Sequence, residues 1–233
     1  MRQLPLSVRL HDRALFESFL PGANAVALAQ FVALTAAPRP GLTWLYGPEG
    51  SGKTHLLQAL CARAGVAAAY VPLPQLLSYG AAALADWHEA RWLCLDDVAA
   101  VIGNLEWERA LFAAYRDCEE RGASLLMAAR AAPPELPFAL PDLASRCAAG
   151  QRIALRALDE DEQCAALQLR ARQRGVELPE ESARYLQRRL PRDMGSLFAV
   201  LEELDDAALT EQRRLTVPFI RDVLARRAVP TLS

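Results

Sequence analysis

The stretch Gly47-Pro48-Glu49-Gly50-Ser51-Gly52-Lys53-Thr54 fits the pattern G-x-x-x-x-G-K-[ST], in which a glycine-rich loop binds phosphates through its backbone N–H groups. Of the 26 basic residues, Lys53 is the single lysine and the others are arginines. A compact ammonium reaches phosphates inside a tight loop, whereas the planar guanidinium suits surfaces and bidentate partners. The stretch therefore predicts a nucleotide site at which Thr54 holds Mg²⁺ through its hydroxyl.

The sequence on either side of this loop predicts the strand and the helix that such a loop requires. Residues 42–46 form a short β-rich run after a Pro-Gly breaker, and residues 54–61 carry apolar side chains at helical spacing. The positive end of that helix favours bound phosphate. A glycine-rich turn without a ligand is the alternative, which the agreement of spacing, flanks and lysine disfavours. His55 is expected to pack beside the loop as part of the nucleotide site.

Composition narrows the class of protein. With 233 residues, 52% of them hydrophobic, the chain can bury a substantial core. A net charge of −2 gives no strong electrostatic footprint for nucleic acid. Neither an apolar run of membrane-spanning length nor a signal-peptide core is evident, so we expect a cytoplasmic protein without membrane contact. The five cysteines are scattered without metal-binding spacing and are expected to be reduced core residues.

The first two thirds of the chain alternate between strand and helix signals. Strands are expected at the β-rich runs, and helices at the segments with a 3.6-residue apolar period, of which 106–121 is the clearest. This order predicts an α/β fold, a parallel five-stranded sheet wound by helices. The expected strands are 42–46, 67–72, 92–95, 124–128 and 152–155, and a helix over 24–35 precedes the first of them.

From Asp159 onward the strand signals cease, and the pattern predicts a small all-helical lid domain. Its helices are expected near 159–174, 179–190, 193–209 and 216–227. The predicted organisation is therefore an N-terminal tail over 1–20, a nucleotide-binding base domain over 21–157 and the lid over 158–233.

A pair of carboxylates follows the third predicted strand. Arg91-Trp92-Leu93-Cys94-Leu95-Asp96-Asp97 reads as a buried strand that ends in two aspartates, the arrangement that holds the nucleotide's Mg²⁺ in phosphate-loop proteins. We assign Asp96 to the Mg²⁺ and place Asp97 beside the nucleotide. A solvated turn is the alternative, and the phosphate loop upstream disfavours it. Because many ATPases of this architecture carry a glutamate where Asp97 stands, we expect slow hydrolysis at this site.

Longer stretches resemble a known family. The DnaA-like clade of the AAA+ superfamily has similar segments to the phosphate loop, the strand Leu93-Cys94-Leu95-Asp96-Asp97, Leu143-Ala144-Ser145-Arg146 and Leu190-Pro191-Arg192-Asp193-Met194. The Hda family of short DnaA homologues is closer still, and resembles Leu140-Pro141-Asp142-Leu143-Ala144-Ser145-Arg146, Leu167-Gln168-Leu169-Arg170-Ala171-Arg172 and Gln212-Arg213-Arg214-Leu215-Thr216-Val217-Pro218-Phe219. The resemblance covers most of the chain. It implies an AAA+ phosphate-loop domain with a helical lid, in a regulator that stimulates hydrolysis of ATP bound to the replication initiator DnaA and so prevents re-initiation.

The same resemblance implies roles for particular residues. Arg146 matches an arginine finger that reaches the ATP of another protein, here DnaA, and Arg192 matches the lid arginine that contacts the chain's own nucleotide. A surface ion pair for Arg146 and an exposed lid charge for Arg192 are the alternatives. Leu20 and Pro21, within residues 19–24, match the entry turn that lines the adenine pocket, although a helix-capping turn explains Asn24 equally well.

The first residues resemble the short peptide with which bacterial proteins bind the DNA polymerase III sliding clamp, its beta subunit. In this reading the Gln3 side chain hydrogen-bonds at the mouth of a pocket, and Leu4 and Leu6 fill apolar subsites. Packing of these leucines on the protein's own core is the alternative. The aromatic residue common in such peptides is replaced here by Ser7 and Val8.

Two features depart from DnaA. After the fourth strand, Ala128, Ala129 and Arg130 stand where DnaA-like chains carry polar residues that sense the γ-phosphate. Because alanine cannot hydrogen-bond a phosphate, we expect weak discrimination between ATP and ADP, with ADP or ATP and Mg²⁺ as a structural ligand. The helix-turn-helix that follows the lid in DnaA has no counterpart here, so no sequence-specific DNA binding is expected.

Other functions remain open on the sequence, as does homo-oligomerisation. A self-sufficient AAA+ ATPase or helicase loader would turn over ATP alone and respond to single-stranded DNA. A small-molecule phosphotransferase would use the same phosphate loop. The residues after the fourth strand and Asp97 disfavour the first, and the four C-terminal helices disfavour the second.

Overall fold

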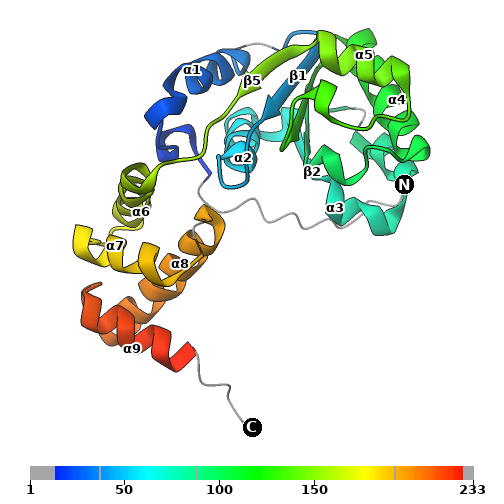
Figure 1. Cartoon of the computed structure of the whole chain (residues 1–233). Helices are drawn as coiled ribbons and strands as arrows, with labels where there is room; N and C mark the ends of the chain where they lie inside the picture. The colour runs from blue at the N-terminus through cyan, green and yellow to red at the C-terminus, as the bar shows by residue number, and fades with distance from the viewer. Residues whose placement is uncertain (1–13, 37, 88, 192, 228–233) are drawn as a thin grey trace. The chain divides into compact units, whose positions relative to one another are not determined.

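The computed structural model describes residues 14–36, 38–87, 89–191 and 193–227. The chain divides into two compact units, residues 1–157 and residues 158–233. Figure 1 shows that all the strands belong to the first unit and that helices α6 to α9 build the second. The expected α/β fold with a C-terminal helical unit is confirmed.

A five-stranded parallel sheet forms the centre of the first unit, with the strand order β2-β3-β4-β1-β5. Each expected strand is present within one residue or two of its expected ends. Because all strands run the same way, their carboxyl ends meet along one edge, where ligands bind in open α/β sheets. The strands are β1 (Gly41–Tyr46), β2 (Ala68–Pro72), β3 (Trp92–Asp96), β4 (Ser124–Ala129) and β5 (Gln151–Ala154).

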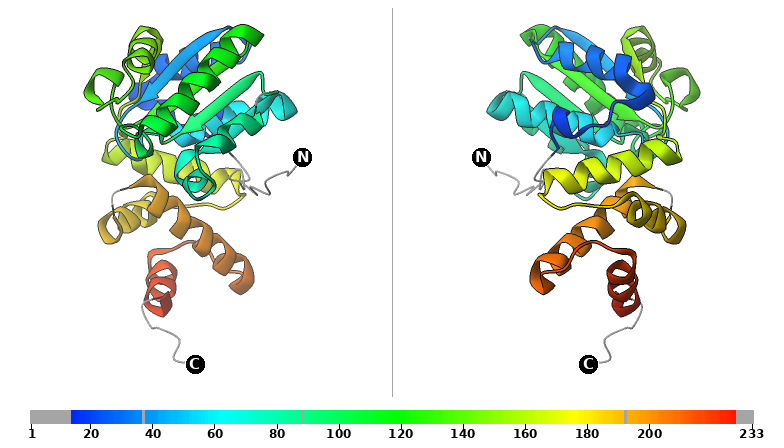
Figure 2. Two further views of the ribbon diagram at one scale, coloured as in Figure 1. Left: turned by 90° about the vertical axis from the view of Figure 1, so that its right-hand side faces the viewer. Right: turned by 90° about the vertical axis from the view of Figure 1, so that its left-hand side faces the viewer.

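Helices cover both faces of this sheet. Helices α1 (Ala25–Leu34) and α2 (Lys53–Ala64) pack on one face, where Phe31 and Leu56 contact side chains such as Leu126. Helices α4 (Leu105–Arg121) and α5 (Pro141–Ala149) pack on the other face, which also holds short α3 (Leu73–Leu76) and the 3-10 segment η5 (Ala81–Trp87). The opposed views of Figure 2 show the green α4 before the sheet in one and the blue α1 before it in the other.

Local sequence explains where α4 begins and ends. The side chain of Asn104 accepts hydrogen bonds from the N–H groups of Glu106 and Trp107. These backbone donors in the first turn of a helix have no partner within the helix itself. Gly122 ends the helix with a φ of 69°, a conformation that glycine adopts without strain. The apolar period over this helix therefore becomes one buried face.

The second unit is entirely helical over its described residues. Its helices are α6 (Glu160–Gln173), α7 (Glu180–Arg189), α8 (Met194–Glu211) and α9 (Val217–Arg227). Asp159 and Glu162 form a capping box at the start of α6. Buried leucines of α6 and α8, with Phe219 of α9, fill the core. Ion pairs between Arg170 and Glu202 and between Arg174 and Asp205 join α6 to α8.

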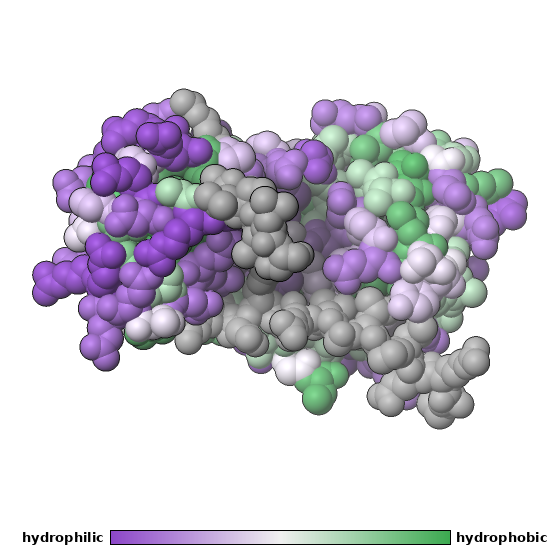
Figure 3. All heavy atoms as spheres, turned by 90° about the horizontal axis from the view of Figure 1, so that it is seen from below, coloured by the Kyte–Doolittle hydropathy of each residue, from purple (hydrophilic) through white to green (hydrophobic). Residues whose placement is uncertain are grey.

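The surface is largely hydrophilic, and the cysteines lie in the core. Seen from below, hydrophilic residues cover most of the described surface and hydrophobic residues appear in small groups (Figure 3). No helix in the described part of the chain is both long and apolar enough to span a membrane. All five cysteines are buried free thiols, as expected.

Candidate nucleotide and partner sites

The phosphate loop lies at the carboxyl edge of the sheet, between the last residue of β1, Tyr46, and the first turn of α2. Gly47, Gly50 and Gly52 all have positive φ, at 157°, 73° and 93°. Only glycine adopts this succession without strain, and it turns the loop back over the start of the helix. The loop and helix thus supply backbone N–H groups at one place, which fits a phosphate group.

Lys53 folds back onto the loop. Its ammonium donates hydrogen bonds to the carbonyl oxygens of Gly47 at 2.8 Å and of Pro48 at 2.7 Å. Burial lowers the pKa of Lys53, and the Asp96 carboxylate opposes that shift. A lysine held by carbonyl oxygens loses no ion pair when it turns to a phosphate, so its charge is available to an anionic ligand.

The predicted Mg²⁺ residues meet at the end of β3. The hydroxyl of Thr54 donates a hydrogen bond to Oδ2 of Asp96 at 2.6 Å, although 42 positions separate them in sequence. The phenol of Tyr70 on β2 donates to the same oxygen at 2.8 Å, and the N–H of Asp97 donates to Oδ1 at 3.0 Å. Asp96 is 6% exposed. A hydroxyl and a carboxylate oxygen in contact are ligands that Mg²⁺ prefers, so this pair fits the cation.

Asp97 has a left-handed backbone, with a φ of 54°. Residues in this conformation carry strain of about 1–3 kcal/mol and cluster at functional sites. Asp97 also lies close enough to Lys53 to raise its pKa. The structure therefore places both aspartates near the loop, Asp96 in contact with Thr54 and Asp97 within electrostatic range of Lys53.

Arg130 reaches the loop from the end of β4. Its Nη1 forms an ion pair with Oε2 of Glu49 at 2.9 Å, and its charge contributes to the lowered pKa of Lys53. Ala128 and Ala129 before it are buried and offer no side-chain hydrogen bond. Because Arg130 and Glu49 are 63% and 65% exposed, the ion pair contributes roughly 0–1 kcal/mol. A small perturbation can therefore release either charge.

The entry segment packs directly on the loop. A Cβ on Gly52 would lie 2.5 Å from the Phe19 ring, whose centre is 5.7 Å from that of His55. Nε2 of His55 lies 2.8 Å from the carbonyl oxygen of Leu15, which places the proton on that nitrogen. Leu20 and Pro21 follow, half-buried and exposed respectively. The segment thus lies beside the nucleotide loop.

Asn24 does not cap a helix, which corrects one of the two explanations given for it above. Its amide donates to the carbonyl oxygen of Arg156 at 2.9 Å and accepts from the N–H of Arg156 at 2.8 Å. No side-chain capping bond forms at the start of α1. Asn24 is 2% exposed, and its side chain lies against the backbone that leaves β5. This residue fastens the entry segment to the end of the sheet.

Arg146 lies at the opposite edge of the sheet. It is exposed on α5, and its guanidinium is 5.7 Å from the centre of the Tyr115 ring. A hollow of about 370 Å³ beside it is lined by Gly41, Ser124 and Gln151, the first residues of β1, β4 and β5. The phosphate loop follows Tyr46, the last residue of β1. Because β1 has six residues, its last residue lies about 17 Å from its first residue, Gly41, in the hollow beside Arg146. Arg146 and the phosphate loop therefore lie at opposite ends of the strands.

Some predicted residues cannot be placed. Gln3, Leu4, Leu6 and Arg192 lie outside the described residues. Within the described ranges, the structure contains no cluster of three or more His, Cys, Asp or Glu that could hold a metal by itself.

The sequence alone did not single out Tyr70, Glu108 or Tyr115. Glu108 is fully buried and its carboxylate accepts three backbone hydrogen bonds, from Gly103, Ala139 and Leu140. The sequence did contain a sign of this buried carboxylate, because position 108 falls on the apolar face of the predicted helix 106–121. Tyr70 had no such signal, since a tyrosine in a strand is ordinary.

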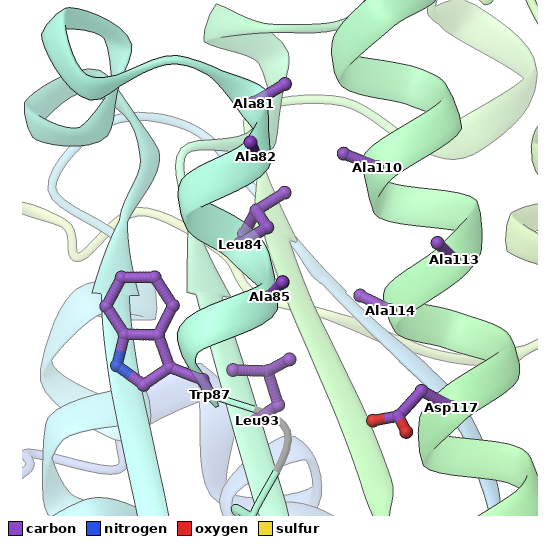
Figure 4. A pocket seen from close by; sticks show the side chains of 10 residues that line it. All are labelled: Ala81, Ala82, Leu84, Ala85, Trp87, Leu93, Ala110, Ala113, Ala114 and Asp117. Carbon is purple, nitrogen blue, oxygen red and sulfur yellow. The ribbon is translucent and has the colours of Figure 1, made fainter. Parts of the chain in front are cut away.

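A second hollow, of about 320 Å³, lies between η5 and α4. Figure 4 shows that alanines from both segments, with Leu84, Trp87 and Leu93, line it. Its carboxylate, Asp117, is bound by Arg121 at 2.6 Å. Apart from Asp117, the residues that line this hollow are apolar.

Comparisons with known proteins agree with this arrangement. A family model described as the lid domain of Hda matches residues 159–224, and one described as the bacterial DnaA ATPase domain matches residues 10–70. Domain III of the Thermotoga maritima replication initiation protein DnaA is similar in structure, with a TM-score of 0.75 at 20% identity, over 93% of this chain and 98% of that one.

Two further solved structures are similar. DnaA bound to AMPPCP and single-stranded DNA has a TM-score of 0.68 at 19% identity, over 88% of this chain and 69% of that one. The Thermotoga maritima RuvB branch migration motor has a TM-score of 0.60 at 16% identity, over 88% and 68%. These likenesses show the AAA+ fold, and the two family models add the specific relationship. The matches of the C-terminal helical unit to the Hda lid and of residues 10–70 to the DnaA ATPase domain, with the AAA+ fold, support an Hda-like, DnaA-homologous AAA+ protein.

Proposed function

We propose that this protein is a nucleotide-bound regulator that binds the DNA sliding clamp and stimulates hydrolysis of ATP held by DnaA. Arg146 acts in trans on the DnaA nucleotide, and the chain's own nucleotide serves as a structural ligand. The observation that carries this proposal is the separation of Arg146 from the phosphate loop, at opposite edges of one sheet.

The ligand of the phosphate loop is a nucleoside di- or triphosphate with Mg²⁺. The loop N–H groups and Lys53 bind the phosphates, and Thr54 with Asp96 would hold the cation. Bound Mg²⁺ neutralises phosphate charge. The AMPPCP in the DnaA structures supports a nucleotide at this fold.

Turnover at the chain's own site is slow, which makes ADP the resting ligand. The side chains of the two buried alanines at the end of β4 cannot orient water or hydrogen-bond a γ-phosphate. Asp97 is one methylene shorter than the usual glutamate, so its carboxylate reaches less far towards water. A site without these groups retains nucleotide better than it hydrolyses it.

Arg146 supplies what the DnaA site requires for faster hydrolysis. A guanidinium at the transferring phosphoryl group stabilises the charge of the transition state, and an arginine supplied by a partner protein raises the rate by about 10³- to 10⁵-fold. The hydrophilic exposed face of α5 leaves Arg146 accessible to a partner. The clamp, bound through Gln3, Leu4 and Leu6, would bring the regulator to DNA.

The test uses DnaA loaded with labelled ATP, with DNA-loaded clamp and this protein. Arg146→Ala should reduce the stimulated hydrolysis roughly 10³-fold or more and leave nucleotide and clamp binding unchanged. Arg91→Ala is the control, because Arg91 precedes β3 at the same edge and its guanidinium lies 6.0 Å from the Trp92 ring centre. Normal stimulation by Arg146→Ala would refute the proposal. Rapid ATP turnover by this protein alone, raised by single-stranded DNA, would favour a loader instead.

A further inference from the structure

The ring of Tyr115, which lies beneath the Arg146 guanidinium, is held in place by neighbouring side chains. Tyr115 is 7% exposed, its ring stacks on Phe112 with centres 6.3 Å apart, and its hydroxyl donates to Oε1 of Glu119 at 3.0 Å. Burial, aided by the hydrogen bond and the charge of Glu119, raises the pKa of Tyr115, and the nearby Arg146 opposes that shift. The ring is therefore held by the Phe112 ring and, through its hydroxyl, by Glu119 before any partner approaches.

Helix α5, which carries Arg146, is fixed as well. Leu143 and Cys147 are buried on its inner face, and Leu140 at its start donates its N–H to the buried carboxylate of Glu108 on α4. Tyr115 also belongs to α4. The two helices that bring ring and guanidinium together are thus joined independently of the Arg146 side chain itself.

The chemistry of this contact differs from that of an ion pair. An aromatic face attracts a guanidinium by roughly 0.5–2 kcal/mol but does not occupy its N–H groups as a carboxylate does. Within the part of the chain that the structure describes, Arg146 forms no ion pair with a carboxylate. Its charge and most of its five donors therefore remain available to an incoming phosphate.

We propose that Tyr115 is a positioning residue for Arg146, holding the guanidinium extended at the amino edge of the sheet in the orientation that the ATP of DnaA requires. This rests on the proposed function of Arg146. Without the ring, a long side chain with several rotatable bonds samples many orientations, and ordering it costs about 1.5–2 kcal/mol. The ring removes part of that cost before the encounter, so it raises the stimulated rate.

The experiment separates rate from affinity. Tyr115→Leu should lower the maximal stimulated hydrolysis by DnaA about 3- to 30-fold, with the half-saturating concentration of the regulator changed less than about threefold. Tyr115→Phe keeps the ring and should retain nearly full activity. Tyr185→Leu is the matched control, since it removes another ring beneath an arginine, Arg189 at 5.6 Å. Normal maximal stimulation by Tyr115→Leu would overturn the inference.

Two further measurements keep the outcomes distinct. If Arg146→Ala stimulates normally, the proposed function fails; if it is inactive while Tyr115→Leu is fully active, only the positioning role fails. If Tyr115→Leu does not fold, NMR of the wild-type protein decides the matter. Ring-current-shifted Arg146 side-chain signals, assigned by their loss in Arg146→Ala, are expected, and unshifted signals would contradict the contact.

Discussion

The carboxylate of Glu108 accepts a hydrogen bond from the N–H of Leu140 at 2.6 Å, which joins the first turn of α4 to the start of α5. The same carboxylate accepts from Gly103 and Ala139. A buried carboxylate with three backbone donors is a satisfied charge, and it fixes the segment that leads into α5. The position of Arg146 therefore depends on a residue that does not contact it in the structure.

Glu108→Gln should destabilise the first unit by about 2–4 kcal/mol, because the amide offers one acceptor oxygen and turns its NH₂ towards backbone donors. Urea unfolding followed by circular dichroism measures the change. Glu106→Gln, an exposed change in the first turn of the same helix, should cost less than about 0.5 kcal/mol. Equal stability of the two variants would show that the buried contacts contribute little.

Lys53→Ala should weaken binding of ADP by about 10- to 150-fold, equivalent to the loss of a charged hydrogen bond of about 1.5–3 kcal/mol. Calorimetry measures the affinity directly. In the wild type, ADP at 100 times its Kd should stabilise the fold by about 2.7 kcal/mol, and at the same concentration the variant should gain only about 0.3–1.4 kcal/mol. Arg63→Ala, towards the far end of α2, is the control. Unchanged affinity for ADP in Lys53→Ala would show that the phosphate loop is not the nucleotide-binding site.

Stability should fall as the solution becomes alkaline, because two buried thiols resist ionisation. Burial raises the pKa of Cys118 to about 11 and that of Cys147 to about 12. Unfolded thiols ionise near 8.5, so above that pH the unfolded chain binds fewer protons than the native one, and the free energy of unfolding decreases until the native pKa values are reached.

The double variant Cys118→Ala, Cys147→Ala should therefore show a shallower loss of stability between about pH 8.5 and 11 than the wild type. Chemical denaturation at a series of pH values gives both slopes, with the values at pH 7 as reference for the cavities that the substitutions create. Identical slopes would mean that these thiols do not contribute to the alkaline limit.

Gln3→Ala combined with Leu4→Ala should abolish retention on immobilised clamp and leave nucleotide binding unchanged. Burial of one leucine is worth roughly 1.5–3 kcal/mol before the costs of association, and the variant loses the Gln3 hydrogen bond as well, so the combined loss is large compared with a short peptide's affinity. Arg9→Ala, beyond the predicted peptide, is the control. Retention of the double variant at wild-type level would leave the regulator without this docking mechanism.

The sequence by itself determined the elements and the chemistry of the loop. Short β-rich apolar runs and the 3.6-residue apolar period are local properties of the chain, and they located each strand of the sheet and the helices of the C-terminal unit. The glycine spacing around Lys53 is equally local, since each residue's backbone conformation depends mainly on its own side chain. These predictions did not depend on which elements pack against one another.

Tertiary structure alone decided which distant residues meet. Asn24 contacts the backbone of Arg156, 132 positions away, and so leaves the start of α1 uncapped, a choice between two hydrogen-bonding partners that local sequence leaves open. The contact of Arg146 with Tyr115, and its distance from the phosphate loop, likewise follow from the way α5 packs on α4 and the sheet. Such pairings depend on the packing of whole elements, which a pattern of neighbouring residues does not encode.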